Sequence, residues 1–368
     1  MRFKHNMKWI LFIIIIVILL ILVILMSIYL NIRNDERIQQ ENFEGVENDF
    51  ENRDLEFSIW IPYWDIENSI DEVVRYRDNI DEIISFAAIY NYPNDEILVL
   101  EELDNTIKAV KNEKLSDMEN FISITNDLKL SDGTYLSKDV DLLKRLLSTE
   151  ESRTKRIEEI IKIAENYKVD GIEIDYEQMH KDKEIWPMYK SFIEELYPIC
   201  VEKGLELRVV LGWKVVDYIN LPEGPEYIIM CYNLFGPHNK VEAGPKADIK
   251  FLSDAYEKNK KLPGNIQIAL ANGGFSWSDD EEVKSLTQNA AVELQKKYNI
   301  EPKRDKKSGA LHFKYKDKNN SYEVWYADSK TLRLWVELGL EYGYNSFAIW
   351  RMGGDLVDDL TIVFEGEG

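Results

Sequence analysis

The sequence predicts an α/β fold, a (β/α)8 TIM barrel with a small α+β insertion between strands 7 and 8, preceded by an N-terminal transmembrane helix. Three observations lead to this prediction. Eight short runs with strand character alternate with stretches of helical periodicity, which is the pattern of a parallel barrel. A stretch at about residues 285–328 breaks the alternation, and an uncharged run near the N-terminus is long enough to cross a bilayer.

The uncharged run covers residues 9–30. A bilayer core needs roughly 20 apolar residues in a helix, so this run can span it. Basic residues precede the run and charges of both signs follow it, which favours a cytoplasmic N-terminus. The alternative is a cleaved signal peptide, but its apolar core would cover only about 7–15 residues and end in small residues. We expect a membrane anchor at 1–32, an acidic linker at 33–54 and a barrel domain at 55–368.

The first half of the predicted barrel contains four strands. Residues 57–64 form a strand whose exit is marked by Pro62, and 82–90 has the continuous apolar centre of a strand buried on both faces. Residues 121–125 make the third strand, and 172–177, where apolar and acidic residues alternate, make the fourth. The helices of this half are expected at residues 70–79, 107–114, 138–147 and 153–167.

The second half supplies the other four strands, expected at residues 207–213, 227–233, 266–270 and 345–350. Its helices are expected at residues 184–202, 249–260 and 332–341. The insertion at 285–328 contains a helix at 287–297 and two strands at 310–315 and 322–326. Such an insertion either walls one side of a cleft or decorates the surface.

Composition limits the classes of partner. The 368 residues are 45% hydrophobic, for which one barrel is the simplest account, and we expect this barrel to be monomeric; the net charge is −22. That charge argues against nucleic acid or an anionic membrane surface as a partner of the folded part. Cys200 and Cys231 are too few for a disulfide framework, and the four histidines lack metal-ligand spacing. No metal site and no cofactor is indicated.

The segment 169–177 is the most informative part of the chain. Its strict alternation sends Glu173, Asp175 and Glu177 to one face of a strand. Strands of a parallel barrel are covered on both faces, where desolvation and mutual repulsion make carboxylates costly. Such clusters usually mark chemistry, although a solvated edge strand would show the same alternation.

Active sites of such barrels lie at the carboxyl ends of the strands. The polar and aromatic residues expected there, besides the three acids, are Tyr63, Trp64, Trp213, Tyr232, Asn233, Trp277, Trp350 and Arg351. Any one tryptophan is more often a core residue than a binding platform. Several strand ends that share aromatic residues beside carboxylates favour a carbohydrate ligand, which offers apolar C–H faces and hydroxyl edges.

Residues 170–177 resemble the Asp-Gly-x-Asp-x-Asp-x-Glu signature of family 18 glycoside hydrolases, the chitinases and their relatives, with Glu173 in place of the first Asp after Gly171. Residues 230–233 are similar to the family's Met-x-Tyr-Asp segment, with Asn233 in place of Asp. Residues 349–355 are similar to its strand-eight tryptophan segment.

The resemblance covers roughly residues 57–359. Residues 273–277, together with the insertion and its segment 323–326, resemble the bacterial branch that includes spore-germination and peptidoglycan-cleaving N-acetylglucosaminidases. The resemblance thus implies a retaining hydrolase that acts on a β-linked, N-acetylated polysaccharide, with peptidoglycan ahead of chitin. With the predicted anchor, it would be a single-pass cell membrane protein whose catalytic domain lies outside the cytoplasm.

The resemblance also implies roles. Glu177 would be the general acid and then the general base, while Asp175 would orient the substrate acetamide and share a proton or hydrogen bond with Glu173. Tyr232 would hydrogen-bond the acetamide, and Trp350 would form the floor of the sugar subsite. Two alternatives stay open: a catalytically silent glycan-binding protein, and an unrelated barrel enzyme that uses Asp175 and Glu177 on a metal.

Overall fold

The computed structural model describes residues 55–113, 115, 117–318, 320–354 and 359–366, together with Met26. The chain divides into two units, Met1–Asn52 and Arg53–Gly368, and the fold described below belongs to the second. The predicted anchor and acidic linker lie, except for Met26, outside the described residues. Within the described ranges, none of the helices combines the length and apolarity that a bilayer crossing requires.

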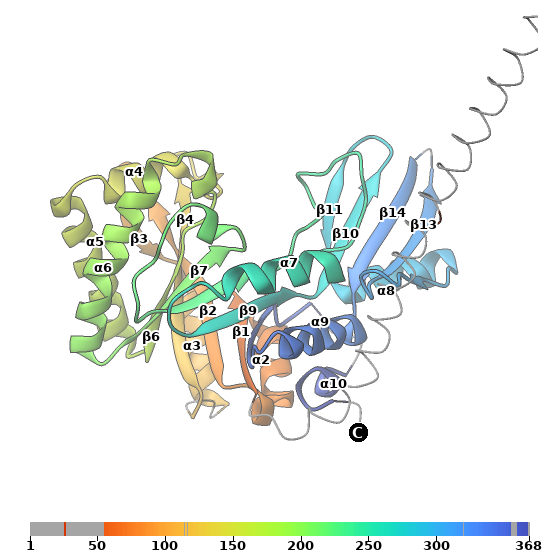
Figure 1. The fold of residues 1–368 in the computed structure, drawn as a ribbon, viewed down its shortest axis with the longest axis horizontal. Helices are drawn as coiled ribbons and strands as arrows, with labels where there is room; N and C mark the ends of the chain where they lie inside the picture. Colours follow the sequence, from red (N-terminus) through yellow and green to blue (C-terminus); the bar gives the residue numbers. More distant parts are fainter. Residues whose placement is uncertain are drawn as a thin grey trace, which may run out of the picture. The chain divides into compact units, whose positions relative to one another are not determined.

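A closed barrel of eight parallel strands forms the core of the described chain. Each strand pairs with the next, and β1 closes the ring against β15 with Phe57 opposite Phe347. The predicted (β/α)8 architecture is therefore confirmed (Figure 1). In ring order the strands are β1 (Glu56–Pro62), β2 (Glu82–Asn91), β4 (Glu119–Lys129), β6 (Gly171–Asp175), β7 (Glu206–Gly212), β8 (Glu226–Met230), β9 (Ile266–Ala271) and β15 (Ser346–Trp350).

Two short strands that the sequence did not predict extend the barrel wall. β3 (Glu96–Val99) pairs antiparallel with β2, and β5 (Tyr135–Leu136) pairs antiparallel with β4. Because β2 and β4 are the longest barrel strands, their carboxyl ends project beyond the ring and offer edges for these additions. The loop that follows β5 is thereby held beside the end of β6.

Helices cover the outside of the barrel (Figure 1). They are α2 (Ile66–Arg75), α3 (Glu101–Asn112), α4 (Val140–Leu147), α5 (Glu150–Tyr167), α6 (Ile185–Lys203), α7 (Ile249–Asn259), α9 (Ser329–Glu341) and α10 (Thr361–Phe364), with 3₁₀ turns at Arg77–Asn79, Met179–Lys181 and Val215–Asp217. α5 shows why the sequence folds this way before β6. Thr149 and Ser152 form a capping box, and Lys168 ends the helix in the left-handed conformation.

The insertion forms a second, antiparallel sheet, with the order β11-β10-β14-β13-β12 among the described residues. Its elements are β10 (Gly273–Ser278), β11 (Val283–Leu286), α8 (Gln288–Tyr298), β12 (Lys303–Arg304), β13 (Leu311–Asp317) and β14 (Asn320–Ala327). It begins at Gly273, earlier than the predicted boundary near residue 285. Gly273 has a φ of +60°, and a Cβ on Gly274 would lie 1.8 Å from the carbonyl oxygen of Trp325. These two glycines let the chain leave β9 and enter the second sheet directly.

The barrel interior is apolar in the middle and charged at its lower end, where the amino ends of the strands lie. The apolar cluster comprises Trp60, Ile84, Phe86, Phe121, Val210, Ile228, Ala269 and Ala348. Below it, the fully buried Arg208 bonds Glu82, Glu226 and Glu173, which come from three different strands. On its upper side the cluster is covered by Tyr63, Met230, Tyr232 and Trp350. Cys200 and Cys231 are buried free thiols.

Candidate active site

Three of the four acids in the 169–177 segment, Glu173, Asp175 and Glu177, point to the inside of the barrel or to its mouth. Glu173 is completely buried and accepts a 2.7 Å hydrogen bond from the indole nitrogen of Trp60, across the barrel on β1. Asp175 is the last residue of β6, and Glu177 lies two residues beyond it. Tyr176, between them, points the other way and stacks on Phe192 of α6. The alternation read from the sequence is therefore the alternation that the strand has.

Lys138 joins two of these acids. Its ammonium nitrogen lies 3.0 Å from Oδ2 of Asp175 and 2.9 Å from Oε1 of Glu177. A single ammonium group can contact both only if the two carboxylates converge at the mouth of the barrel. Lys138 lies between β5 and α4, and sequence reasoning missed it because a lysine in a polar loop carries no signal of its own.

Asn126, at 0% exposure on β4, fixes the backbone of Glu177. Its side-chain oxygen accepts from the backbone N–H of Glu177 at 2.9 Å, and its amide nitrogen donates to the backbone oxygen of Glu177 at 3.2 Å. The same nitrogen donates to the backbone oxygen of Asp139 at 3.1 Å. Asn126 thus holds Glu177 and the Lys138–Asp139 loop in one arrangement, and it too was missed by the sequence analysis.

Burial controls the electrostatics of the site. It raises the pKa of Asp175 above its ordinary value; Glu177 and Glu173 act in the same direction, while Lys138 opposes them. Burial alone would lower the pKa of Lys138, but the negative charges of Asp175 and Glu177 outweigh it and raise that pKa. Burial also raises the pKa of Tyr232 well above its usual range, so its phenol stays protonated and can donate a hydrogen bond.

A cavity of about 580 Å³ opens beside Glu177. Four residues that the sequence analysis singled out line it together: Glu177, Trp213, Tyr232 and Asn233. Further lining residues that it did not single out include Trp186, Tyr218 and His238. The cavity therefore combines one carboxylate of the acidic pair with aromatic surfaces and hydrogen-bonding groups, which suits a sugar.

Trp350 lies beside this site at the top of the apolar cluster. Its ring centroid is 5.9 Å from that of Trp60, 5.3 Å from Phe86 and 6.3 Å from Trp64. Trp64 is 51% exposed and contacts Tyr63 edge to face at 4.8 Å. Tyr63, Trp64 and Trp350 thus form one aromatic group at the barrel mouth, as the positions of their strands predict.

Two predicted binding residues are already engaged within the protein. Arg351 forms an ion pair with Asp65 at 2.7 Å and donates to the backbone oxygen of Met352. Trp277 was predicted at the end of strand seven, and that placement was wrong. It lies on β10 of the second sheet, is 4% exposed, and donates its indole N–H to the backbone oxygen of Asn239 at 2.7 Å.

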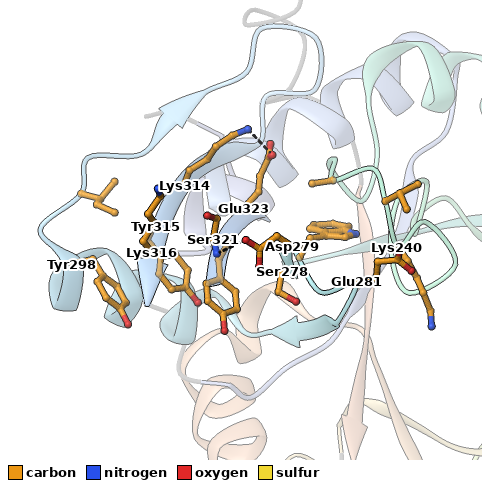
Figure 2. A pocket seen from close by; sticks show the side chains of 15 residues that line it. Lys240, Ser278, Asp279, Glu281, Tyr298, Lys314, Tyr315, Lys316, Ser321 and Glu323 are labelled. Carbon is orange, nitrogen blue, oxygen red and sulfur yellow. Dashed lines mark hydrogen bonds and ion pairs between the residues drawn. The ribbon is translucent and has the colours of Figure 1, made fainter. Parts of the chain in front are cut away.

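A larger cavity, of about 880 Å³, lies between the insertion and residues 240–243 and is drawn in Figure 2. Lys314 and Tyr315 both line it, although neighbouring residues of a strand project to opposite faces. Figure 2 shows this: Lys314, paired with Glu323, lies on one side of the strands, and Tyr298 and Tyr315 lie on the other. Its lining does not converge on a reacting centre, so the site beside Glu177 is the stronger candidate.

The model of the family described as "Glycosyl hydrolases family 18" matches residues 59–355. A curated relative from Bacillus anthracis, named "Cortical fragment-lytic enzyme", is 22% identical over 322 residues, which cover 80% of this chain and 73% of the relative. Another, "Uncharacterized glycosylase YvbX" from Bacillus subtilis (strain 168), is 23% identical over 234 residues, which cover 59% of this chain and 67% of the relative.

Solved structures with the same fold include the spore cortex-lytic enzyme SleL from Bacillus cereus. It matches with a TM-score of 0.70 and 19% sequence identity, over 86% of this chain and 75% of that chain. A chitinase from Chromobacterium violaceum matches with a TM-score of 0.69 and 16% identity, over 85% of this chain and 99% of that one. At these identities the likeness concerns the fold.

Proposed function

This chain belongs to glycosyl hydrolase family 18, and from that membership we propose that it cleaves a β-linked glycan containing N-acetylglucosamine, with retention of configuration and with help from the substrate's own acetamide. One observation carries the proposal. Asp175 and Glu177 converge on Lys138 at the mouth of a closed barrel, beside a cavity that Glu177 lines together with Tyr232 and Trp213.

Asp175 and Glu177 both extend from the end of β6, and this arrangement favours a mechanism in which the substrate assists. A conventional retaining glycosidase places one carboxyl on each side of the scissile bond, about 5–5.5 Å apart, and uses one as the nucleophile. Asp175 and Glu177 instead leave one strand end side by side and share a single ammonium partner. Asp175 is therefore badly placed for attack from the opposite face while Glu177 protonates the leaving oxygen.

The substrate supplies the nucleophile in the proposed reaction. Glu177 gives its proton to the glycosidic oxygen, the C1–O bond breaks, and the acetamide oxygen forms a bond to C1. Asp175 stabilises the acetamide N–H of the oxazolinium-like intermediate, and Tyr232 donates a hydrogen bond to the acetamide oxygen. Water then attacks C1, the bond between C1 and the acetamide oxygen breaks, and the water gives a proton to Glu177, which restores the acid.

Peptidoglycan is the favoured substrate over chitin. The relative from Bacillus anthracis is named for lysis of cortical fragments, and the sequence of the insertion resembles the peptidoglycan-cleaving branch. We further propose that residues 1–32 anchor the protein in the cell membrane, and that 33–54 tether the barrel outside the cytoplasm. The proposed anchor and the proposed substrate agree with each other, because a barrel tethered outside the cytoplasm would lie next to the wall glycan.

The test compares wild type with Glu177→Gln on chitooligosaccharides and on purified peptidoglycan. Loss of the general acid should lower the rate by about 10²- to 10⁴-fold, with glycan binding retained. Glu202→Gln, on the exposed face of α6, is the matched control and should turn over like wild type. Equal product release by wild type and Glu177→Gln would remove Glu177 from the mechanism.

A glycan-binding protein without hydrolytic activity is the second candidate. Both acids are already engaged in ion pairs with Lys138, and Asn233 stands where the family usually has a carboxylate. Both functions predict sugar binding, so turnover separates them. Saturable binding of a chitooligosaccharide, with no product from wild type on either substrate, would favour the binding protein.

A further inference from the structure

Several contacts besides its two ion pairs hold Lys138 at the site. Its backbone N–H donates to Oδ1 of Asp127 at 2.7 Å, and its own backbone adopts the left-handed conformation, with a φ of +53°. The next residue, Asp139, accepts the N-cap hydrogen bond of α4 from Leu142. The ammonium nitrogen also lies 5.5 Å from the ring centroid of Phe86. The lysine is thus held at the barrel mouth by residues of β2, β4 and α4.

The ion pairs of Lys138 are largely screened from water. The side chains of Lys138, Asp175 and Glu177 are 14%, 10% and 25% exposed. An opposite charge within about 4–6 Å in such a setting favours the ionised form of a carboxyl group strongly. A general acid, however, must carry its proton when the glycosidic bond breaks. The lysine therefore opposes the protonation on which the proposed chemistry depends.

We propose that Lys138 is a positioning residue that holds Asp175 and Glu177 together and sets the pH range in which this pair of acids keeps its catalytic proton. The inference rests on the proposed function, since it concerns the same acid and the same reaction. Lys138 does not itself exchange a proton in the reaction. Its positive charge offsets the repulsion between the two neighbouring carboxylates, and it acts against protonation of the pair, as it does at Asp175.

The charged and titratable groups around the lysine are few enough to name. Asp175 and Glu177 face it from the end of β6, and Asp127 faces it from β4. Asp175 in turn interacts with Glu173, and Tyr232 interacts with Glu173, Asp175 and Glu177. None of these other groups is changed in Lys138→Met or in Lys138→Arg, so a pH profile that differs between the two variants can be assigned to the loss of the positive charge.

The experiment measures kcat/KM against pH for wild type, Lys138→Met and Lys138→Arg on a chitooligosaccharide. The alkaline limb reports loss of the proton from the general acid. Without the ammonium group, that proton is held to higher pH, so Lys138→Met should move the limb upward by about one to three pH units. Lys138→Arg keeps the charge and should leave the limb close to that of wild type. A purely structural role would not separate the two variants in this way.

Two results would overturn the inference: an unchanged alkaline limb in Lys138→Met, or an equal shift in Lys138→Met and Lys138→Arg. If Lys138→Met folds but turns over too slowly to measure, or if wild type itself releases no product, NMR titration of ¹³C-labelled carboxyl groups decides. The higher apparent pKa of the Asp175–Glu177 pair should then be higher in Lys138→Met than in wild type, and equal values would refute the proposal. Because that titration needs no turnover, failure of this inference is distinguishable from failure of the proposed function.

Discussion

At the scale of single residues, the site depends on contacts between segments that are far apart in the chain. The alternation of 172–177 was sufficient to predict that Glu173, Asp175 and Glu177 share a face. It could not reveal Lys138 or Asn126, which approach from a different strand and loop about 40 to 50 residues earlier. Local periodicity reports which way a side chain points, and not what it meets there.

Tyr232 illustrates a residue whose role was predicted and whose chemistry the structure refines. Burial raises its pKa, so the phenol is a hydrogen-bond donor throughout the working range of a carboxylic general acid. We expect Tyr232→Phe to lower kcat by about 10- to 100-fold, the loss of one hydrogen bond to a group that becomes charged. Steady-state kinetics on a chitooligosaccharide check this.

The control for that variant is Tyr342→Phe. Tyr342 follows α9 and contacts Tyr256 of α7, on the helical layer of the barrel. It should show the kcat of wild type. A Tyr232→Phe variant with unchanged kcat and KM would exclude a hydrogen bond from Tyr232 in the rate-limiting step.

At the scale of elements, β6 is positioned by a close approach that only glycine permits. A Cβ on Gly171 would lie 2.3 Å from the ring of Phe121 on β4 and 2.7 Å from the backbone oxygen of Glu206. The sequence motif contains Gly171, but its reason is visible only in the barrel, where β4 and β7 flank β6 on both sides. The glycine lets the strand that carries Asp175 sit between its neighbours.

Gly171→Ala should therefore lower the free energy of unfolding by about 1–3 kcal/mol, through overpacking against Phe121. The matched control is Gly212→Ala at the end of β7, where an added Cβ would meet nothing within 4 Å. Its effect should stay within about 0.5 kcal/mol. Urea unfolding of both variants measures the difference. Equal stabilities would show that β4 and β7 can move apart to accept the methyl group.

The start of the insertion, by contrast, was predicted wrongly from the sequence. Residues 273–277 follow β9 after only Asn272 and contain apolar residues, so periodicity continues the strand. The positive φ of Gly273 redirects the chain into the second sheet, and no sequence pattern distinguishes such a glycine from one in a regular strand. Trp277 was misplaced for that reason.

At the scale of the whole molecule, the barrel was predictable because its repeating signal is strong. Eight apolar runs separated by helices allow few arrangements, and all eight predicted strands are found in the described barrel. The charged lower end was not predictable, because Glu82, Arg208 and Glu226 stand on separate strands that only closure of the ring brings together. Burial raises the pKa of Glu82 to about 8. The positive charge of Arg208 opposes this rise, but several neighbouring carboxyls share that one charge and add to the rise.

This cluster makes the stability of the barrel depend on pH. A carboxyl whose pKa is higher in the folded than in the unfolded state contributes stability that is complete below its unfolded pKa, about 4.3. The contribution is lost as the pH rises toward about 8, the folded-state value for Glu82. In Glu82→Gln the neutral side chain does not titrate. The stability of this variant relative to wild type should therefore increase between pH 5 and pH 8.

Urea unfolding of wild type and Glu82→Gln across that range checks the prediction. Glu67→Gln, on the exposed side of α2, provides the control and should differ from wild type by the same amount at each pH. A stability difference between Glu82→Gln and wild type that does not change with pH would mean that Glu82 is ionised in the folded barrel at pH 5.

The measurement that bears most directly on the proposed chemistry is the anomeric configuration of the first product, followed by ¹H NMR in the first minutes of chitooligosaccharide hydrolysis. Attack by the substrate acetamide, with Glu177 as the acid and Asp175 beside it, inverts C1 twice and releases the β-anomer first. Early appearance of the α-anomer would mean that water attacks C1 directly, and it would contradict the mechanism assigned to this pair of acids.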